Sequence, residues 1–382
     1  MPDWGEHMQR KCKVIAAGHV CLDITPVFAS KEPMKLDQLL IPGKLVLMDA
    51  ADVHTGGSVS NTGLALKLFG ADVKLVGKVG LDDFGQTIAN IFKGYGVEEG
   101  LIVDENSTTS YSVVIAAPGV DRIFLHHPGA NDTFSSEDID EKLLEDVQLF
   151  HFGYPPIMKR MYEHQGEELV RLFQRMKAKE IMTSLDMAAI DPNSDAGKQD
   201  WHEILRRLLP YVDFFLPSAE EVCFMLDPER LQEWKRRAAG RDITELLSIE
   251  QDIDPLGLQL IDLGAKVVLI KCGAPGLYYR TGTAEALASI GKGYLSEPSE
   301  WANRSGFEKS YRPDRVVSAT GAGDTTIAAF LAALLKRYPL DSCLRLATAA
   351  GASNVTEYDA LSGLRTLPEL EERIQKGWLK SW

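Results

Sequence analysis

The residues best suited to chemistry form a short run of small side chains followed by one carboxylate. Gly321, Ala322 and Gly323 leave the backbone open, and Asp324 stands at the start of a helix predicted over 325–337. Such a helix directs free N–H groups and the positive end of its dipole at this point, so an anion can bind there. Asp324 can cap the helix, or it can act as a general base beside a group that develops negative charge.

Two common nucleotide-binding motifs are missing from the sequence. No Gly-x-x-x-x-Gly-Lys-Ser/Thr loop occurs, and no Gly-x-Gly-x-x-Gly motif opens a helix after a strand. Their absence argues against a P-loop nucleotidase and against a dinucleotide-binding Rossmann domain.

The charge balance restricts the partners. The 382 residues include 41 Lys and Arg against 55 Asp and Glu, a formal charge of −14. We expect no nucleic-acid partner, because a protein that binds a phosphate backbone needs a basic face. A nucleotide site is still compatible with this charge, since a few backbone N–H groups can hold phosphates.

The cysteines and apolar runs indicate the compartment. Unpaired cysteines suit a reducing environment, and the apolar run 14–17 is too short for a signal segment. No stretch approaches the roughly 20 apolar residues of a membrane span. We therefore expect a cytoplasmic protein with no membrane partner. The five cysteines are scattered without a Cys-x-x-Cys pair, at Cys12, Cys21, Cys223, Cys272 and Cys343.

Strand-like and helix-like segments alternate along most of the chain. This rhythm predicts an α/β fold with a mainly parallel sheet and crossover helices. Strands are predicted at 14–17, 73–79, 149–152, 181–185, 214–216 and 267–270, and helices at 59–69, 84–95, 167–179, 202–209, 325–337 and 343–355.

One region departs from this rhythm. Residues 111–115 and 122–126 read as a hairpin, with a turn at Pro118 and Gly119. Such a hairpin can pair with β-rich pieces at 24–28 and 44–48. We expect a small β lid built from parts of residues 20–54 and 109–127. Two further segments read as insertions, a charged helical one at 227–254 and an irregular surface one at 281–313.

The chain resembles the PfkB, or ribokinase-like, carbohydrate kinases. Residues 316–331 resemble the C-terminal signature of that family, Asp-Thr-Thr-Gly-Ala-Gly-Asp leading into a helix. Order and spacing agree over roughly residues 13–375. Further matches are the opening strand end at 18–23, the Gly-Gly signature at 56–61 with its continuation at 77–85, and Pro-Gly-Ala-Asn at 128–131.

The resemblance implies a fold and a reaction. The fold would be a three-layer α/β/α sandwich with a small β lid, in a single kinase domain over 13–375. The reaction would move the γ-phosphate of ATP to a hydroxyl, a primary one by preference, of a small sugar or sugar derivative. Asp324 would be the general base, and the N–H groups of Gly321, Ala322 and Gly323 would stabilise the transferring phosphoryl group, with Mg²⁺.

The resemblance also implies a sugar subsite. Asp23 would accept hydrogen bonds from sugar hydroxyls, Gly56 and Gly57 would let the sugar approach the backbone, and Asn61 would bind hydroxyls from a helix start. From the residues alone, Asp23 can equally be a turn carboxylate and Asn61 a helix-start amide.

The nucleotide side follows from two more matches. Ser218 stands where the family usually has Asn, and Glu221 falls on the glutamate that acts on Mg²⁺, through water. Lys271, Gly273 and Gly276 match a turn beside the nucleotide. Lys271 would face phosphate, although a solvated lysine at a strand end is the alternative interpretation.

Departures from the family pattern leave other outcomes open. Ser318 and Ala319 replace the Asp and Thr that open the C-terminal signature. This change weakens the case for a monovalent-cation (K⁺) requirement. A nucleoside kinase of the same family and a non-catalytic sugar- or nucleotide-binding regulator are the alternatives. The lid also suggests a homodimer through lid-to-lid packing, which sedimentation at micromolar concentration tests.

Overall fold

A nine-stranded sheet runs through the described chain, which the computed structural model covers at residues 13–30, 32–33, 35–120, 122–291, 295 and 297–381. Its order is β13-β12-β11-β10-β9-β8-β1-β4-β5. Neighbours from β5 to β11 pair in parallel, and β12 and β13 join antiparallel at one edge. The strands are β1 (Lys13–Gly18), β4 (Asp72–Gly80), β5 (Leu101–Asp104), β8 (Val147–Gly153), β9 (Met182–Asp186), β10 (Phe214–Phe215), β11 (Val267–Lys271), β12 (Gly276–Thr281) and β13 (Ser305–Lys309).

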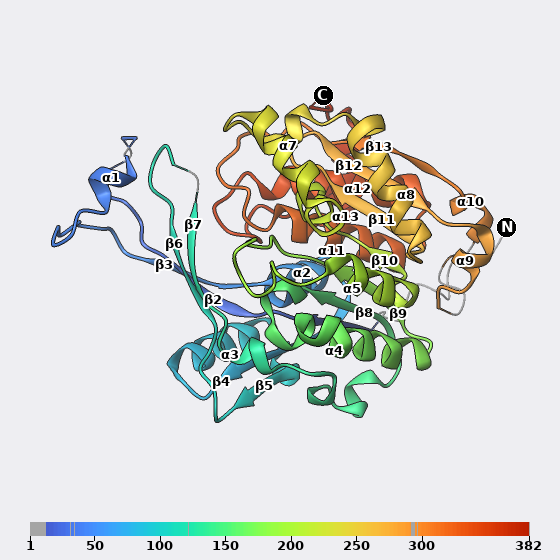
Figure 1. Ribbon diagram of the computed structural model, residues 1–382, viewed down its shortest axis with the longest axis horizontal. Coiled ribbons are helices and arrows are strands. Elements are labelled where there is room, and N and C mark those ends of the chain that lie inside the picture. Colours follow the sequence, from blue (N-terminus) through green and yellow to red (C-terminus); the bar gives the residue numbers. More distant parts are fainter. Residues whose placement is uncertain are drawn as a thin grey trace.

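Helices cover both faces of this sheet (Figure 1). Alternate residues of β1 show the two cores: Val14 and Ala16 pack into one, Ile15 and Ala17 into the other, as the period of a strand requires. The predicted three-layer α/β/α sandwich is confirmed. The first core contains α2 (Ser58–Leu68), α3 (Asp83–Tyr95), α11 (Ala322–Leu335), α12 (Leu340–Asn354) and α13 (Leu367–Gln375). The second contains α4 (Lys159–Ala178), α5 (Trp201–Leu208), α6 (Ala219–Leu226), α7 (Pro228–Ala238) and α8 (Asp254–Asp262).

A second sheet of four strands forms the lid, in the order β3-β2-β6-β7. β2 pairs antiparallel with β3 and parallel with β6, and β6 forms a hairpin with β7. These strands project to the left of the body in Figure 1, with α1 (Leu36–Leu39) beyond them. The predicted lid is therefore confirmed. Its strands are β2 (Cys21–Thr25), β3 (Asp52–Gly56), β6 (Tyr111–Ile115) and β7 (Ile123–His127).

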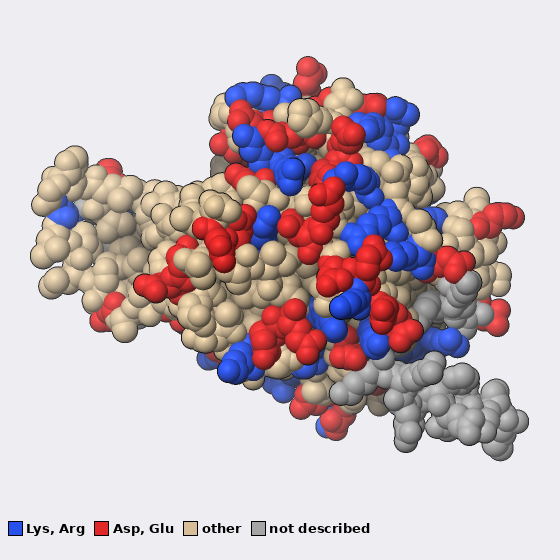
Figure 2. All heavy atoms as spheres, turned by 90° about the horizontal axis from the view of Figure 1, so that it is seen from below, with Lys and Arg blue, Asp and Glu red and all other residues tan. Residues whose placement is uncertain are grey.

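The surfaces of the body and the lid differ in charge. Figure 2 shows positive and negative side chains interspersed over the body, and few charged side chains at the end of the projecting arm. Large apolar side chains are exposed on this arm, among them Leu45 at 84% and Leu47 at 79%. Among the described residues, no helix has the length and apolar character needed to span a membrane.

Three local predictions are wrong. Residues 44–48 form no strand, and only Met48 makes an isolated bridge to Phe28. Residues 281–313 are not irregular, because they contain α9 (Ala284–Ala288), α10 (Pro298–Trp301) and the edge strand β13. The third error concerns helix starts, since the helices predicted from residues 325 and 343 begin at Ala322 and Leu340. β13 was hard to predict because Phe307 is its one large apolar residue, and pairing with β12 makes it a strand.

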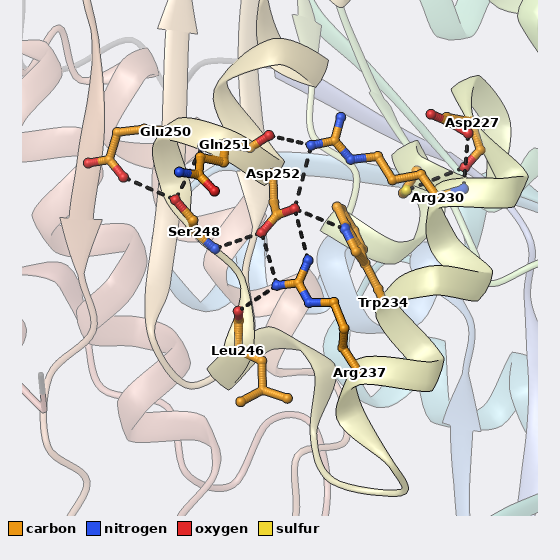
Figure 3. Close-up of polar contacts among 10 residues, drawn as sticks. Asp227, Arg230, Trp234, Arg237, Leu246, Ser248, Glu250, Gln251 and Asp252 are labelled. Atoms are coloured by element: carbon orange, nitrogen blue, oxygen red, sulfur yellow. Dashed lines mark hydrogen bonds and ion pairs between the residues drawn. The ribbon is translucent and has the colours of Figure 1, made fainter.

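The charged segment 227–254 is helical, as predicted, and one carboxylate organises it (Figure 3). Asp252 accepts hydrogen bonds from the backbone N–H of Ser248 at 2.9 Å and from the indole of Trp234 at 3.1 Å. The guanidinium groups of Arg237 and Arg230 lie 3.4 and 3.5 Å from its oxygens. The segment is therefore tied together by its own side chains.

A second buried carboxylate holds three strands together at the end of the sheet where β10 and β11 begin. Asp213 is 0% exposed and receives Lys266 Nζ at 2.6 Å and Lys177 Nζ at 2.9 Å. It also accepts the backbone N–H of Thr183, in β9, at 3.0 Å. Removing the carboxylate leaves two cations and one N–H without this partner.

We expect Asp213→Ala to lower the free energy of unfolding by about 3–5 kcal/mol, the usual loss when one partner of a buried pair is removed. Urea denaturation measures it. Glu372→Ala is the matched control, since Glu372 pairs with Lys376 at 2.6 Å on α13 while 63% exposed. The control should lose under about 1 kcal/mol, and an equal loss in both variants would contradict the structural role of Asp213.

Candidate active site

The carboxyl ends of the parallel strands meet at one edge of the sheet and carry polar side chains there. His19 follows β1, Tyr154 follows β8, Asp186 ends β9, Ser218 lies just after β10, and Lys271 ends β11. All five line one cleft of about 710 Å³. This edge is the usual ligand-binding edge of a parallel sheet.

The carboxylate of Asp324 lies in this cleft, 4% exposed, at the start of α11. The hydroxyl of Tyr154 lies 2.9 Å from each of its two oxygens. Asn61 Nδ2 donates to Oδ2 and Thr62 Oγ1 donates to Oδ1, both at 3.1 Å. Burial raises the pKa of Asp324, and these hydrogen bonds and the nearby Lys271 charge oppose that rise.

The turn before Asp324 has the geometry of an exposed helix N-terminus. Gly321 has φ +72°, and a Cβ there would lie 2.3 Å from Ala360 Cβ, so the position requires glycine. α11 begins at Ala322, whose N–H also donates to Ala319 O at 3.2 Å. Gly321, Ala322 and Gly323 all line the cleft, which brings the helix N-terminus and Asp324 to the same wall.

Lys271 and Asp186 form an ion pair beside this turn. Lys271 Nζ lies 2.5 Å from Asp186 Oδ1, and the Asp186 side chain is 1% exposed. Burial raises the pKa of Asp186, with Lys271 opposing the rise and Glu221 and Asp324 adding to it. A Cβ on Gly323 would lie 3.6 Å from Lys271 Nζ, so this cation reaches the anion-binding turn. Lys271 is thus not the solvated strand-end lysine of the alternative interpretation.

The other wall carries Ser218 and Glu221 at the start of α6. They form a capping box, in which Ser218 N donates to Glu221 Oε2 at 2.6 Å and Glu221 N donates to Ser218 Oγ at 3.3 Å. Gly273 lies next to Thr244 of the 227–254 segment, and Asp242 of that segment also lines the cleft. The segment therefore forms part of the rim.

The lid side of the cleft contains Asp23, whose pKa is raised by burial. Cys21 Sγ lies 3.3 Å from Asp23 Oδ1. Gly57 lines the cleft with φ +84° and leaves no room for a Cβ, which would lie 2.5 Å from His19 O. The structure thus brings Asp23 and Gly57 together beside Asn61, which points at Asp324.

Two predicted site residues lie outside the cleft lining. A Cβ on Gly56 would lie 2.1 Å from Asp23 Oδ2, so this glycine makes room for the carboxylate of Asp23. Gly276 begins β12 and packs against β13. The lining contains every other predicted site residue: Asp23, Gly57, Asn61, Ser218, Glu221, Lys271, Gly273, Gly321, Ala322, Gly323 and Asp324.

Sequence reasoning missed four residues of the site. Tyr154 and Thr62 bind Asp324, Asp186 binds Lys271, and His19 lies 3.3 Å from His126 of the lid, ring nitrogen to ring nitrogen. Three of them end or directly follow a parallel strand, which was the available signal. Thr62 had none, because it sits inside a helix.

Comparison with known proteins agrees with this geometry. The family model described as pfkB family carbohydrate kinase matches residues 19–367. A 5-dehydro-2-deoxygluconokinase of Clostridium beijerinckii is 22% identical over 381 residues, 96% of this chain and 94% of that protein. Solved structures include a fructokinase with bound ATP from Xylella fastidiosa (TM-score 0.69, 19% identity) and a putative ribokinase II with ATP and Mg²⁺ from E. coli (TM-score 0.67, 22% identity). Each alignment covers 96% of this chain and 99% of the other.

The sandwich, the lid and the cleft at the strand ends define the ribokinase fold. The chain belongs to the pfkB family of carbohydrate kinases. It is a sugar kinase, a phosphotransferase whose acceptor is a sugar hydroxyl.

We expect Gly57→Ala to lower kcat/KM for the sugar by about 10–100-fold, because the new Cβ displaces His19 and the cleft wall. Gly377→Ala is the matched control, with φ +86° and no heavy atom within 4 Å of the position that its Cβ would take. Steady-state kinetics and thermal unfolding of both variants check this. Equal losses of kcat/KM would mean that backbone strain, and not the cleft, is responsible.

Proposed function

We propose that this chain is an ATP-dependent kinase of a small sugar or sugar derivative, with Asp324 as general base. The observation that carries the proposal is the position of Asp324, which lies in the cleft at the N-terminus of α11, directly after Gly321, Ala322 and Gly323. A base and an anion-binding turn are therefore side by side. Phosphoryl transfer needs little more than positioning and charge stabilisation.

The step we propose is a direct displacement. The acceptor hydroxyl gives its proton to the carboxylate of Asp324, and its oxygen forms a bond to the γ-phosphorus of ATP. The bond from that phosphorus to the bridging oxygen breaks, which leaves ADP. We propose that the N–H groups of residues 321–323, of which Ala322 N–H would exchange its bond to Ala319 O, and the ammonium of Lys271 stabilise the charge on the transferring group. Closure of the lid would exclude water from this step.

The donor set at the cleft fits Mg²⁺ bound mainly through phosphates. Glu221 and Asp186 supply carboxylate oxygens, the ligand type that Mg²⁺ prefers. Among the described residues no group of three or more His, Cys, Asp or Glu could hold a metal. Mg²⁺ commonly uses only one or two carboxylates together with substrate phosphates and water. Mg²⁺ would supply neutralisation of phosphate charge, and Glu221 would hold it through water.

The acceptor we favour is a sugar, a keto-sugar or a sugar acid. Asp23 can accept hydrogen bonds from hydroxyls, and Gly57 opens the backbone beside it. The relatives of this chain include a 5-dehydro-2-deoxygluconokinase and a fructokinase. A nucleoside acceptor would need flat side chains on both faces of its base. Of the flat side chains in the described lining, Tyr154 is engaged with Asp324 and His19 with His126, which leaves Phe124 of the lid and supports a sugar instead.

Two further expectations concern potassium and dimerisation. A K⁺ requirement has little support, because Ser318 and Ala319 stand where the family signature has Asp and Thr, and Ser318 Oγ bonds instead to Thr320 Oγ1 at 2.8 Å. Lid-to-lid dimerisation stays a prediction. A non-catalytic regulator is disfavoured by a base held in place by three other side chains.

We expect Asp324→Asn to reduce acceptor-dependent ADP release by about 10²–10⁴-fold while ATP binding persists. The assay supplies Mg·ATP with a panel of sugars, sugar acids and nucleosides, and calorimetry follows ATP binding. Asp341→Asn is the control, since Asp341 lies in the first turn of α12, 59% exposed and paired with Arg304. Full turnover in Asp324→Asn would mean that another group is the base.

We expect Glu221→Gln to raise the Mg²⁺ concentration for half-maximal activity by about 10-fold, with the KM for the sugar unchanged. Glutamine still completes the capping box of α6, so the helix keeps its start. Glu369→Gln is the matched control, because it makes the same change in the capping box that Glu369 forms with Thr366 at the surface of α13. Equal Mg²⁺ dependence in wild type and Glu221→Gln would show that Glu221 does not help to bind Mg²⁺.

A further inference from the structure

Three protein donors surround the carboxylate of Asp324. Oδ1 receives Thr62 Oγ1 and Oδ2 receives Asn61 Nδ2, and the hydroxyl of Tyr154 lies 2.9 Å from both. These groups bring three donor hydrogens to a carboxylate with about four acceptor sites. The single hydroxyl of Tyr154 is equidistant from both oxygens, so a substrate hydroxyl that approaches between them meets the phenol.

We expect the phenol to yield when the acceptor hydroxyl arrives. Thr62 is 0% exposed in α2, and Asn61 lines the cleft but contacts only Oδ2. Tyr154 lies in the turn after β8, with φ +69°, lines the cleft, and contacts both oxygens. Its backbone is tied down by a bond from its N–H to Asp186 O at 3.3 Å, so the ring can turn about a held main chain.

We propose that the Tyr154 hydroxyl occupies the proton-accepting position of Asp324 until a sugar hydroxyl displaces it. Tyr154 is then a positioning residue that couples ATP cleavage to the presence of sugar. This inference rests on the proposed function, and it assigns control of ATP cleavage to Tyr154. After displacement, the phenol keeps its bond to the other oxygen and holds the carboxylate in line with the acceptor.

The contact between Tyr154 and Asp324 matters because water can compete with the sugar as the phosphoryl acceptor. If water gave its proton to Asp324 and its oxygen attacked the γ-phosphorus, the bridging bond would break and release ADP and phosphate. Water gains too few contacts in the cleft to displace the phenol, whereas a sugar also binds Asp23 and the backbone near Gly57. The phenol stays protonated as a donor, since burial and the charges of Asp324, Asp186 and Glu221 raise the pKa of Tyr154 well above its usual value.

The pH dependence reports this contact. Asp324 faces Asn61 and Thr62 from α2 and Lys271 from β11, together with the acidic groups of Asp186 and Glu221. The Tyr154 hydrogen bond lowers the pKa of Asp324. Its loss raises that pKa, so the base is protonated at higher pH. The acidic limb of kcat/KM should move upward when the hydroxyl is removed.

Tyr154→Phe tests the inference in the full-length chain. We expect ADP release without sugar to rise about 10-fold and sugar-dependent kcat to fall about 10-fold, with the acidic limb of kcat/KM displaced to higher pH. Tyr278→Phe is the matched control. Tyr278 donates to Asp254 at 2.9 Å and lies outside the cleft lining, so its variant loses a bond of the same kind. Thermal unfolding of both variants shows whether each folds.

The outcomes separate two failures. Suppose that wild-type turnover requires Asp324. If Tyr154→Phe then leaves the ratio of sugar-dependent to sugar-independent ADP release and the acidic limb of kcat/KM unchanged, this inference alone is overturned. A folded wild type with no acceptor-dependent turnover contradicts the proposed function and this inference together. Changes of equal size in Tyr278→Phe also overturn it, because the effect would not be specific to the base.

Discussion

The cleft depends on one buried carboxylate that must be compensated from several directions. Asp324 is 4% exposed, and an uncompensated charge at that depth is costly. Its donors come from α2, through Asn61 and Thr62, and from the turn after β8, through Tyr154. Satisfying Asp324 therefore brings α11, α2 and the strand ends of the sheet into one arrangement, and the same contacts bear on its proposed role as a base.

Buried carboxylates at the two ends of the central strands have different partners. Asp213, at the edge away from the cleft, has two lysines and a backbone N–H around it and lies among structural residues. Asp186, at the cleft edge, has one lysine, and two further carboxylates raise its pKa. Under the proposed function, a phosphate-bound cation would neutralise the surplus of negative charge at the cleft. At the opposite ends of the strands, Lys177 and Lys266 supply the positive charge.

The lid and one inserted segment complete the rim of the site. Its β6–β7 hairpin brings His126 within 3.3 Å of His19 on the body, and the 227–254 segment adds Asp242 and Thr244 at the opposite rim. Asp252 and the side chains around it hold that segment in shape (Figure 3). Asp324 and the turn before it belong to the sandwich itself, so the proposed chemistry uses elements of the sandwich while attached segments form the rim.

The sequence alone determined the alternation of strands and helices, the hairpin of the lid, and the turn of small residues before Asp324. These are local patterns, in which the residues that matter stand close together along the chain. Weak edge strands such as β13 were missed because pairing, not composition, makes them strands. Only the tertiary structure placed Tyr154 and Asn61 on Asp324 and Asp186 on Lys271, because these partners are 170, 263 and 85 residues apart. No local pattern reports such contacts, since burial creates the need for them only after the chain has folded.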